Sequence, residues 1–456
     1  MIATSQPAGT ACAESAATVG PPNSEFFMHQ KSLRLIVGIA VCAAGFTGAG
    51  VAQNVVSDWN NVWLDTVRAT GGGPCPISRA GAMVSVAVFE AANSIDPQYQ
   101  PYVAFVPVTQ PADQTSAIAV AAHDVLVHIY PARQPIFDAA LATTLAGIPP
   151  GAAKTNGIAV GQAAASACIV DRIGDHSDNN APYNFGTRPG DYQLTDSFLA
   201  PHGPNWWQCD TWVINNSNYF RVEPPLGFNS MKQLLQSPAY AAQFNEVKSL
   251  GEQNSVTRTA EQTEIAWFWA NDRDGTYKPP GHLNYAVQVI AAQEGLTVLQ
   301  EARVLALLNL ALADAVVKIW ESKFHTNIDF WRPVTGIRQA ATDGNPATVP
   351  DSNWNPLLEF TPPFPSYASG HSSMGGAFAG VLATVFGTDN VTFTIGTDEP
   401  IVQTVTRTFN SFSEAGFEDA LSRIYLGVHW RMDCEAAYAT GMRIGQYVAT
   451  NALLPL

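Results

Sequence analysis

Apolar residues recur at helical spacing through most of the chain, and strict alternation of apolar and polar residues is rare. In the first part of the chain, residues 78–93 and 116–129 show this spacing most clearly, and Pro and Gly separate such segments. Because Pro and Gly interrupt helices, residues 54–174 predict a bundle of several helices. In the second part, the same spacing predicts helices at 260–270, 283–292, 299–323, 371–386, 413–425 and 431–450.

Irregular segments divide this helical pattern. Residues 177–230 are rich in Pro and Asn and predict a long connection between two halves of the chain. The one short strand candidate is 391–395, and no internal repeat is found. The pattern therefore predicts an all-α protein of two helical bundles. The first covers residues 53–230 and includes the proline-rich connection, and the second covers residues 231–456.

The first 52 residues have the pattern of an export signal. A polar leader precedes Met28, the basic residues His29, Lys31 and Arg34 follow, and an apolar run extends from 35 to 51. This order is typical of a secretory signal peptide that starts at Met28. A membrane anchor is the alternative, but the run is shorter than the ~20 residues of a membrane span and contains several glycines. We therefore expect a secreted or extracytoplasmic protein without stable membrane insertion after cleavage.

Cysteine content is compatible with export but leaves the redox state open. Cys12 and Cys42 lie in the predicted leader and signal, and four cysteines remain: Cys75, Cys168, Cys209 and Cys434. These four permit one or two disulfides, and buried free thiols are an equally good interpretation.

Composition and charge narrow the class of partner. The chain has 456 residues, of which 46% are hydrophobic and 13% charged, so it is long enough for two to three packing units. Its net charge of -15 argues against a nucleic-acid partner, because phosphate binding needs a surface of Lys and Arg. Any anion site must therefore be a local cluster of basic residues.

One candidate for such a cluster is the start of the helix predicted at 371–386. Ser369 and Gly370 lie where a loop enters this helix, and free backbone N–H groups and the helix dipole favour an anion there. The Ser369 hydroxyl and the titratable His371 would add side-chain donors. The alternative is an ordinary capping serine followed by a solvent-facing histidine.

A second candidate is the stretch SRIYLGVHWRMD, residues 422–433. Arg423 and His429 would point to different sides of one unbroken helix, but Gly427 offers a break. We therefore expect one helix to end near Tyr425 and another to begin near His429, so that both side chains meet. Asp433 is expected on the same helical face as His429, where it would orient the imidazole. A purely structural histidine is the alternative.

A third candidate is the stretch KFHTNIDFWRP, residues 323–333. Lys323 ends the longest apolar helix, and Arg332 precedes Pro333, which is expected to start another turn. Surface positions are the commonest fate of Lys and Arg. The aromatic neighbours Trp320 and Trp331 argue instead for buried cations with a partner.

Together these three segments resemble the superfamily of phosphatidic acid phosphatase type 2 and vanadium haloperoxidases. Its signature is K-x6-RP, PSGH and SR-x5-H-x3-D, and the third part matches in full at Ser422, Arg423, His429 and Asp433. The stretches TPPFPSYASGHSSMGGA and SRIYLGVHWRMD look most like the chloroperoxidase branch. The likeness covers about the last 200 residues and extends upstream to EIAWFWANDRDG, which contains Asp272.

The resemblance implies a vanadate cofactor and a role for each matched residue. His429 would bind vanadium, and the vanadate oxygens would be held by Lys323, Arg332, Ser369, the Gly370 N–H and Arg423. His371 would be the acid/base, with Asp433 supporting His429. Trp320 and Phe364 would line the halide side, and Asp272 would hold Arg423.

Two departures from the signature concern the loop and the lysine. Ala368 replaces the proline of PSGH, which changes only the stiffness of the loop. Eight residues instead of six separate Lys323 from Arg332. In a continuous helix, two extra residues rotate the register by about 200 degrees. Either a local bulge absorbs them, or His325 takes the place of the lysine. Lys323 is favoured because Trp320 keeps the family's distance to it.

The resemblance implies a peroxidase that uses hydrogen peroxide to oxidise bromide or chloride to hypohalous acid, which then meets a small organic acceptor. An exported acid phosphatase with His429 as its nucleophile is the alternative enzyme, since vanadate resembles the transition state of phosphoryl transfer. A non-catalytic oxyanion-binding protein is a third possibility, supported by the altered Lys323 spacing.

Overall fold

The computed structural model describes residues 54–103, 105–195, 198–215 and 218–456. Within these ranges the protein is predominantly helical, as predicted, with one small sheet. The leader and signal peptide predicted over 1–52 lie outside the described residues.

The helices and strands of the described residues follow the predicted segments closely. They are α1 (Val55–Thr70), α2 (Pro74–Ile95), α3 (Gln114–Ile129), α4 (Gln134–Ala146), α5 (Ala152–Asp171), α6 (Met231–Leu235), α7 (Pro238–Leu250), α8 (Ala260–Ala270), α9 (Lys278–Gln293), α10 (Val298–Phe324), α11 (Pro333–Arg338), α12 (Gly370–Phe386), β1 (Phe393–Ile395), β2 (Arg407–Phe409), α13 (Phe412–Tyr425) and α14 (Arg431–Asn451).

Local sequence signals explain where the principal helices begin. Thr297 and Gln300 form a reciprocal capping box at the start of α10, in which each side chain accepts from the other residue's backbone N–H. Ser369 caps α12, and its side chain accepts from Ser372 N. These caps satisfy N–H groups that the first turn of a helix leaves without partners.

The small sheet was only half predicted. The strand expected at 391–395 is observed as β1, which pairs antiparallel with β2. No strand was predicted at β2, because three residues are too short to show a clear alternation. The short helices α6 and α7 were also not predicted individually.

The connection at 177–230 is irregular, as predicted. Its described residues contain only three-residue 3-10 turns, at Trp206–Gln208, Asn218–Phe220 and Pro225–Gly227. A carboxylate of α10 fixes part of it, since Asp314 accepts from the backbone N–H groups of Trp212, Val213 and Ile214 at 2.6, 2.9 and 3.0 Å. Burial raises the pKa of Asp314 to about 6.

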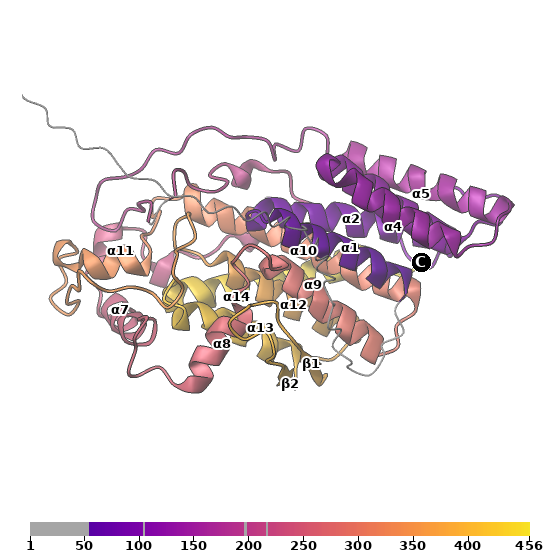
Figure 1. The fold of residues 1–456 in the computed structure, drawn as a ribbon. Coiled ribbons are helices and arrows are strands. Elements are labelled where there is room, and N and C mark those ends of the chain that lie inside the picture. The colour runs from indigo at the N-terminus through magenta and orange to yellow at the C-terminus, as the bar shows by residue number, and fades with distance from the viewer. Residues whose placement is uncertain (1–53, 104, 196–197, 216–217) are drawn as a thin grey trace, which may run out of the picture. The chain divides into compact units, whose positions relative to one another are not determined.

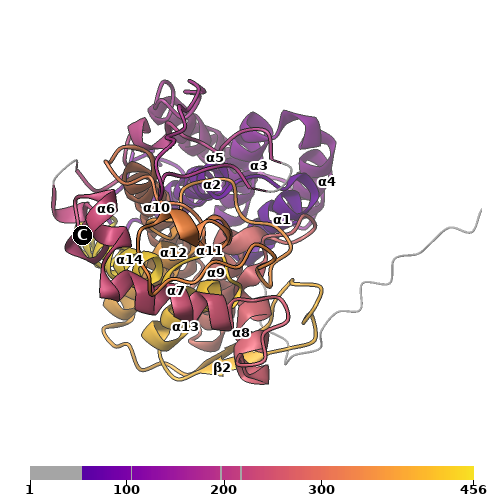
Figure 2. The ribbon, with the colours of Figure 1, turned by 90° about the vertical axis from the view of Figure 1, so that its left-hand side faces the viewer.

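Helix α10 is the element around which the others pack. It contacts α2 on one side and α12 and α14 on another. Figures 1 and 2 show it between the first five helices and helices α12–α14. Nearly every residue from Ala302 to Trp320 is buried, as the long apolar run in this part of the sequence predicted. The division of the chain at residue 230 into two bundles stays a prediction.

The state of the cysteines and the search for membrane-spanning helices can be compared with the sequence-based expectations. The four cysteines of the described residues, Cys75, Cys168, Cys209 and Cys434, are buried free thiols. Among the described helices, α2 alone is long and apolar enough to cross a membrane, and most of it is buried inside the protein.

Helices α12 and α14 approach each other so closely that their backbones touch. A Cβ at Gly441 of α14 would lie 2.0 Å from the Ser373 carbonyl oxygen of α12. A Cβ at Gly376 of α12 would lie 2.2 Å from the Tyr438 carbonyl oxygen of α14. Glycine at these positions sets the distance between the two helices, because no side chain would fit. The first turns of both helices contribute to the candidate site.

We expect Gly441→Ala to destabilise the protein by about 1–3 kcal/mol or more, because overpacking forces the two helices apart. The matched control is Ala439→Gly on an exposed position of the same helix, where the loss of helix propensity costs about 1 kcal/mol. Urea-induced unfolding followed by circular dichroism measures both. A Gly441→Ala protein as stable as wild type would contradict the close contact.

Candidate functional site

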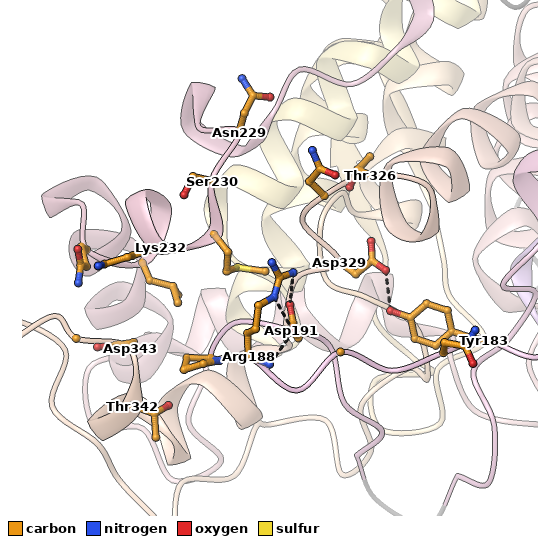
Figure 3. A pocket seen from close by; sticks show the side chains of 18 residues that line it. Tyr183, Arg188, Asp191, Asn229, Ser230, Lys232, Thr326, Asp329, Thr342 and Asp343 are labelled. Atoms are coloured by element: carbon orange, nitrogen blue, oxygen red, sulfur yellow. Dashed lines mark hydrogen bonds and ion pairs between the residues drawn. The ribbon is translucent and has the colours of Figure 1, made fainter.

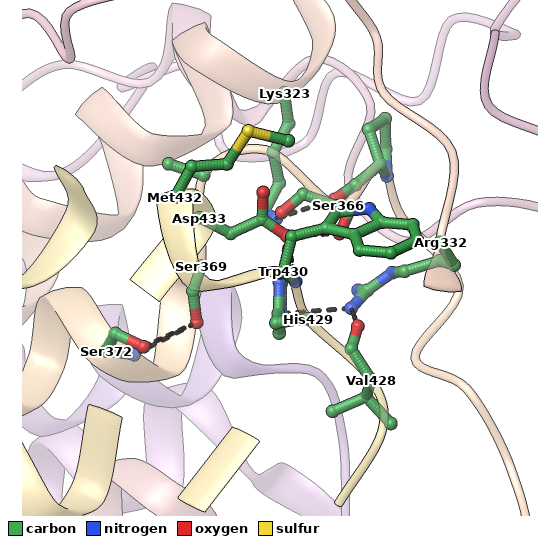
Figure 4. A network of polar contacts seen from close by, with 12 residues as sticks. Lys323, Arg332, Ser366, Ser369, Ser372, Val428, His429, Trp430, Met432 and Asp433 are labelled. Carbon is green, nitrogen blue, oxygen red and sulfur yellow. Dashed lines mark hydrogen bonds and ion pairs between the residues drawn. The ribbon is translucent and has the colours of Figure 1, made fainter. Parts of the chain in front are cut away.

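The three predicted segments meet at one buried cluster of polar side chains (Figure 4). Lys323 comes from the last turn of α10, Arg332 from the residue before α11, and Ser369 from the start of α12. His429 lies in the turn between α13 and α14. These residues are spread along the chain from position 323 to position 429, and the packing of α10, α12 and α14 brings them together.

His429 is held in one tautomer by its two neighbours. Its Nδ1 lies 3.0 Å from Asp433 Oδ2, and its Nε2 lies 2.9 Å from Nη1 of Arg332. A carboxylate accepts the Nδ1 proton, and a guanidinium can only donate, so Nε2 carries the lone pair. Burial, Arg332 and Lys323 all lower the pKa of His429 well below its usual range. His429 is therefore a neutral imidazole whose Nε2 faces a cationic pocket.

The contact between His429 and Asp433 is as predicted, but its expected geometry was wrong. The two residues were expected on the same face of one helix. Instead α14 begins at Arg431, so His429 precedes the helix and Asp433 lies in its first turn. Asp433 Oδ2 reaches back to accept from Trp430 N at 3.0 Å as well as from His429. Asp433 thus combines a helix-capping role with the orientation of the imidazole.

The break between α13 and α14 occurs where Gly427 predicted it. Helix α13 ends at Tyr425, and Gly427 has a φ of 77°. A Cβ at Gly427 would also lie 2.4 Å from the Gly251 carbonyl oxygen. Glycine is therefore required both by the left-handed backbone and by the approach of α7.

Lys323, and not His325, lies in the buried cluster. The Lys323 side chain is fully buried, and its Nζ donates to the carbonyl oxygens of Pro365 and Ser366 at 2.7 and 3.2 Å. His325 lies after the end of α10, is exposed, and stacks on Trp207 with ring centroids 3.8 Å apart. No helical bulge absorbs the two extra residues, because they lie in the loop that follows α10.

The two arginines are anchored differently. Arg332 is fully buried and donates through Nε to the Phe364 carbonyl oxygen at 2.8 Å and through Nη1 to the Val428 carbonyl oxygen at 2.8 Å. Arg423 is 2% exposed and forms an ion pair with Asp272, with Nη2 and Oδ2 2.8 Å apart. The predicted link between Asp272 and Arg423 is therefore present.

Several buried donors of this cluster have no hydrogen-bond partner among the described residues. They are Nη2 of Arg332 and both Nε and Nη1 of Arg423. Burial lowers the pKa of Arg332 to about 10, and burial and Arg332 lower the pKa of Lys323 well below its usual range. Unpaired buried charges are costly, so the cluster suits an anionic ligand that accepts from several donors at once.

The start of α12 adds backbone donors to the same place. Ser369 is fully buried, and its hydroxyl accepts from Ser372 N at 3.2 Å and from the Ser372 hydroxyl at 2.8 Å. Gly370 is the first residue of the helix, and a Cβ there would lie 3.0 Å from the Trp320 ring. The free N–H groups of this first turn favour an anion, as the sequence predicted.

A cavity of about 510 Å³ opens onto the cluster. It is lined by Gly370, His371, Arg423 and His429, by Asp272, and by apolar residues of several loops and helices. The apolar lining residues include Pro74, Phe198, Pro279, Phe360, Pro362, Pro363, Phe364 and Met374. A mostly apolar cavity with a few convergent polar groups is the usual form of a small-molecule site.

The two aromatic residues predicted for the halide side are placed differently. Phe364 lines the cavity, and its ring lies 4.8 Å from Nζ of Lys323 and 4.8 Å from the guanidinium of Arg332. Trp320 is fully buried behind it, with ring centroids 5.0 Å apart. Trp320 therefore supports Phe364 and packs against Gly370 from outside the cavity lining.

Two polar residues of the site, Ser366 and Asp419, were missed in the sequence. The Ser366 hydroxyl donates to Asp433 Oδ2 in a short hydrogen bond. Asp419 of α13 lies 2.5 Å from Nε2 of His371. Asp419 precedes Arg423 by four residues, so the helical spacing was a signal that could have indicated a shared face.

A larger cavity of about 810 Å³ lies away from this cluster, beside the irregular connection (Figure 3). None of the predicted site residues lines it. Its acidic side chains already have partners: Asp191 binds Arg188 at 2.9 Å, and Asp329 accepts from the Tyr183 hydroxyl at 2.7 Å. This cavity therefore lacks a set of convergent reactive groups.

Comparison with known proteins agrees with this geometry. Residues 303–454 match the family model of the VCPO second helical-bundle domain. Vanadium chloroperoxidase of Curvularia inaequalis is 29% identical over 296 residues, which cover 53% of this chain and 47% of that protein. The match thus spans about half the length of the curated relative.

Solved structures extend the likeness to most of the chain. A bacterial vanadium-dependent iodoperoxidase superposes with a TM-score of 0.75 at 24% identity, covering 88% of this chain and 97% of the other. A holo-type bacterial vanadium-dependent chloroperoxidase superposes with a TM-score of 0.66 at 15% identity, covering 88% and 93%. The resemblance predicted from the sequence is confirmed: residues 303–454 match the model of the VCPO second helical-bundle domain, and the chain has the helical fold seen in bacterial vanadium haloperoxidases.

Proposed function

We propose that this protein is a vanadate-dependent haloperoxidase that uses hydrogen peroxide to oxidise halide to hypohalous acid. The observation that supports it most is the set of unpartnered buried donors on Arg332 and Arg423, which surrounds the neutral Nε2 of His429. The relatives support vanadate as the anion, since they carry vanadium in their names. These relatives are named chloroperoxidase and iodoperoxidase, so the halide that this protein oxidises has to be measured.

The residues of the cluster fit vanadate in both charge and donor type. His429 Nε2 would bind vanadium in place of its contact with Arg332 Nη1, because the proton on Nδ1 leaves the lone pair on Nε2. Arg332, Arg423, Lys323, Ser369 and the Gly370 N–H would hold the oxygens. Bound vanadate would supply a Lewis acid that activates hydrogen peroxide toward attack by halide.

The other residues of the site act on protons, water and orientation. Asp433 keeps the His429 proton on Nδ1, and Asp272 holds the Arg423 guanidinium in place. His371 faces the cavity and would exchange protons with peroxide as the acid/base. The Phe364 wall excludes water from the cationic side and so strengthens each hydrogen bond there.

An exported acid phosphatase is the second candidate, and one observation favours it. A neutral His429 held by Asp433 is also suited to attack phosphorus, with His371 protonating the leaving group. The same donors would hold phosphate, so only an activity measurement distinguishes the two enzymes. The predicted signal at 1–52 further leads us to propose secretion or another extracytoplasmic location for either one.

We expect the purified protein to halogenate a chlorinated dione with peroxide and bromide only after reconstitution with orthovanadate. Chloride and iodide are tested in parallel, and hydrolysis of nitrophenyl phosphate is measured in the vanadate-free protein. Phosphate hydrolysis without halogenation would show the phosphatase, and inactivity in both assays would show a binding protein. His429→Ala should abolish whichever activity is present, and retained turnover would mean that the centre lies elsewhere.

The position of the lysine gives a separate prediction. We expect Lys323→Met to weaken vanadate binding about 10- to 100-fold, because a hydrogen bond to a charged group contributes about 1.5–3 kcal/mol. His325→Ala is the matched control and should change the affinity less than about twofold, because His325 stacks on Trp207 away from the cluster. Titration of the vanadate-free protein by isothermal calorimetry measures both. A larger effect of His325→Ala would show that the histidine replaces the lysine.

A further inference from the structure

A buried carboxylate stands directly behind the candidate acid/base. Asp419 is 1% exposed and lies on α13, with Oδ1 2.5 Å from Nε2 of His371 on α12. His371 is itself only 9% exposed, and it lines the wall of the 510 Å³ cavity. His371 thus lies at the cavity surface, and Asp419 lies behind it between the packed helices α12 and α13.

The backbone is shaped to make room for this carboxylate. Gly375 lies one turn after His371 on α12, and a Cβ there would lie 2.6 Å from Asp419 Oδ2. The same Cβ would lie 2.7 Å from the Gly416 carbonyl oxygen of α13, and a Cβ at Gly416 would lie 2.3 Å from the Gly375 carbonyl oxygen. Two glycines therefore let α12 and α13 approach closely enough for Asp419 to reach His371.

The charged groups around the pair come from several elements. Arg423 lies one turn after Asp419 on α13, and Asp272 follows α8, where Trp269 hydrogen-bonds His371 through its backbone. Two further histidines, His282 of α9 and His429, also lie in this electrostatic environment. Burial raises the pKa of Asp419 and lowers that of His371, and Arg423 acts on both groups as a nearby cation. Two buried groups with opposing shifts are suited to share one proton.

We propose that Asp419 is a positioning residue for His371, holding the imidazole in one orientation against the cavity wall through the close contact of its Oδ1 with Nε2. The arrangement parallels that of Asp433 and His429, so each histidine of the site has its own buried carboxylate. A carboxylate behind an acid/base fixes the tautomer and stabilises the protonated ring while it carries a proton. The catalytic meaning of this role rests on the proposed haloperoxidase function.

The role of Asp419 is tested first in the full-length, vanadate-free protein, so that the result does not depend on activity. Imidazole ¹⁵N chemical shifts of histidine-labelled protein report the tautomer, and His371→Gln assigns the signal. We expect a single set of His371 ring shifts in the wild type, and changed shifts or more than one set in Asp419→Asn. Asp419→Ser removes the carboxylate with a smaller side chain if the amide prevents folding. Unchanged His371 shifts in a folded Asp419 variant would overturn the proposal.

Kinetics of the vanadate-loaded protein then separate positioning from a merely structural role. We expect Asp419→Asn to lower kcat about 10- to 100-fold and to shift the pH profile, while the Kd for vanadate changes less than about twofold. In the His371→Gln background the same substitution should change kcat less than about twofold, because the residue that it positions is gone. An equal loss in both backgrounds would contradict the proposal.

The matched control is Glu414→Gln, which removes an exposed carboxylate from the same helix and should leave kcat and the pH profile as in the wild type. A control variant that loses kcat as Asp419→Asn does would show an effect of α13 charge and overturn the assignment. If the wild type shows no halogenation at all, the proposed function fails, and the ¹⁵N measurement still decides whether Asp419 holds His371.

Discussion

The burial of cations around one cavity is the constraint on which this structure depends. Lys323, Arg332 and Arg423 lie within the protein interior, where an unpaired charge is costly. The Asp272 carboxylate pairs with Arg423. The other partners are the ring nitrogen of His429 and the carbonyl oxygens of Phe364, Pro365, Ser366 and Val428. Carbonyl oxygens orient the cations without neutralising them, so the positive potential is left for a ligand.

Such an arrangement requires backbone that does not move. The carbonyl acceptors lie on loops, and these loops are held by close helix contacts on either side. Glycines at the crossings of α12 with α13 and α14 bring main chain against main chain, which leaves little freedom for one helix to slide on another. The irregular connection is also held in place by Asp314. Its carboxylate accepts hydrogen bonds from the backbone N–H groups of three consecutive residues, 212–214.

Much of this could be predicted from the sequence, for identifiable physical reasons. The helices of the second half are long and strongly apolar, so their spacing located them within a few residues. Lys323 and Arg332 were singled out because Lys and Arg among aromatic residues are unusual. Asp272 and Phe364 came only from the resemblance to a known family. The geometry was harder: His429 and Asp433 do meet, but through a capping contact and not through a shared helical face.

Other features depend on contacts that no local pattern records. Asp419 was missed because its partner, His371, lies on a different helix and because an acidic residue in a helix is usually solvent-exposed. The strand β2 was missed because its three residues form a strand only through their hydrogen bonds to β1, which the local sequence does not show. Trp320 was placed on the cavity wall, whereas the packing of Gly370 and Phe364 puts it one layer behind.

The loop between the end of α10 and Arg332 matters both for sequence-motif searches and for the choice of labelling sites. Both of its ends are fixed, by the buried Lys323 side chain and by the carbonyl partners of Arg332, while residues 325–327 between them are exposed. The two extra residues in this loop therefore leave Lys323 and Arg332 in one cluster, and a search that demands a fixed spacing would pass over such chains. For the same reason, this loop is a suitable place to insert a fluorophore attachment site or a short tag without disturbing the anion pocket.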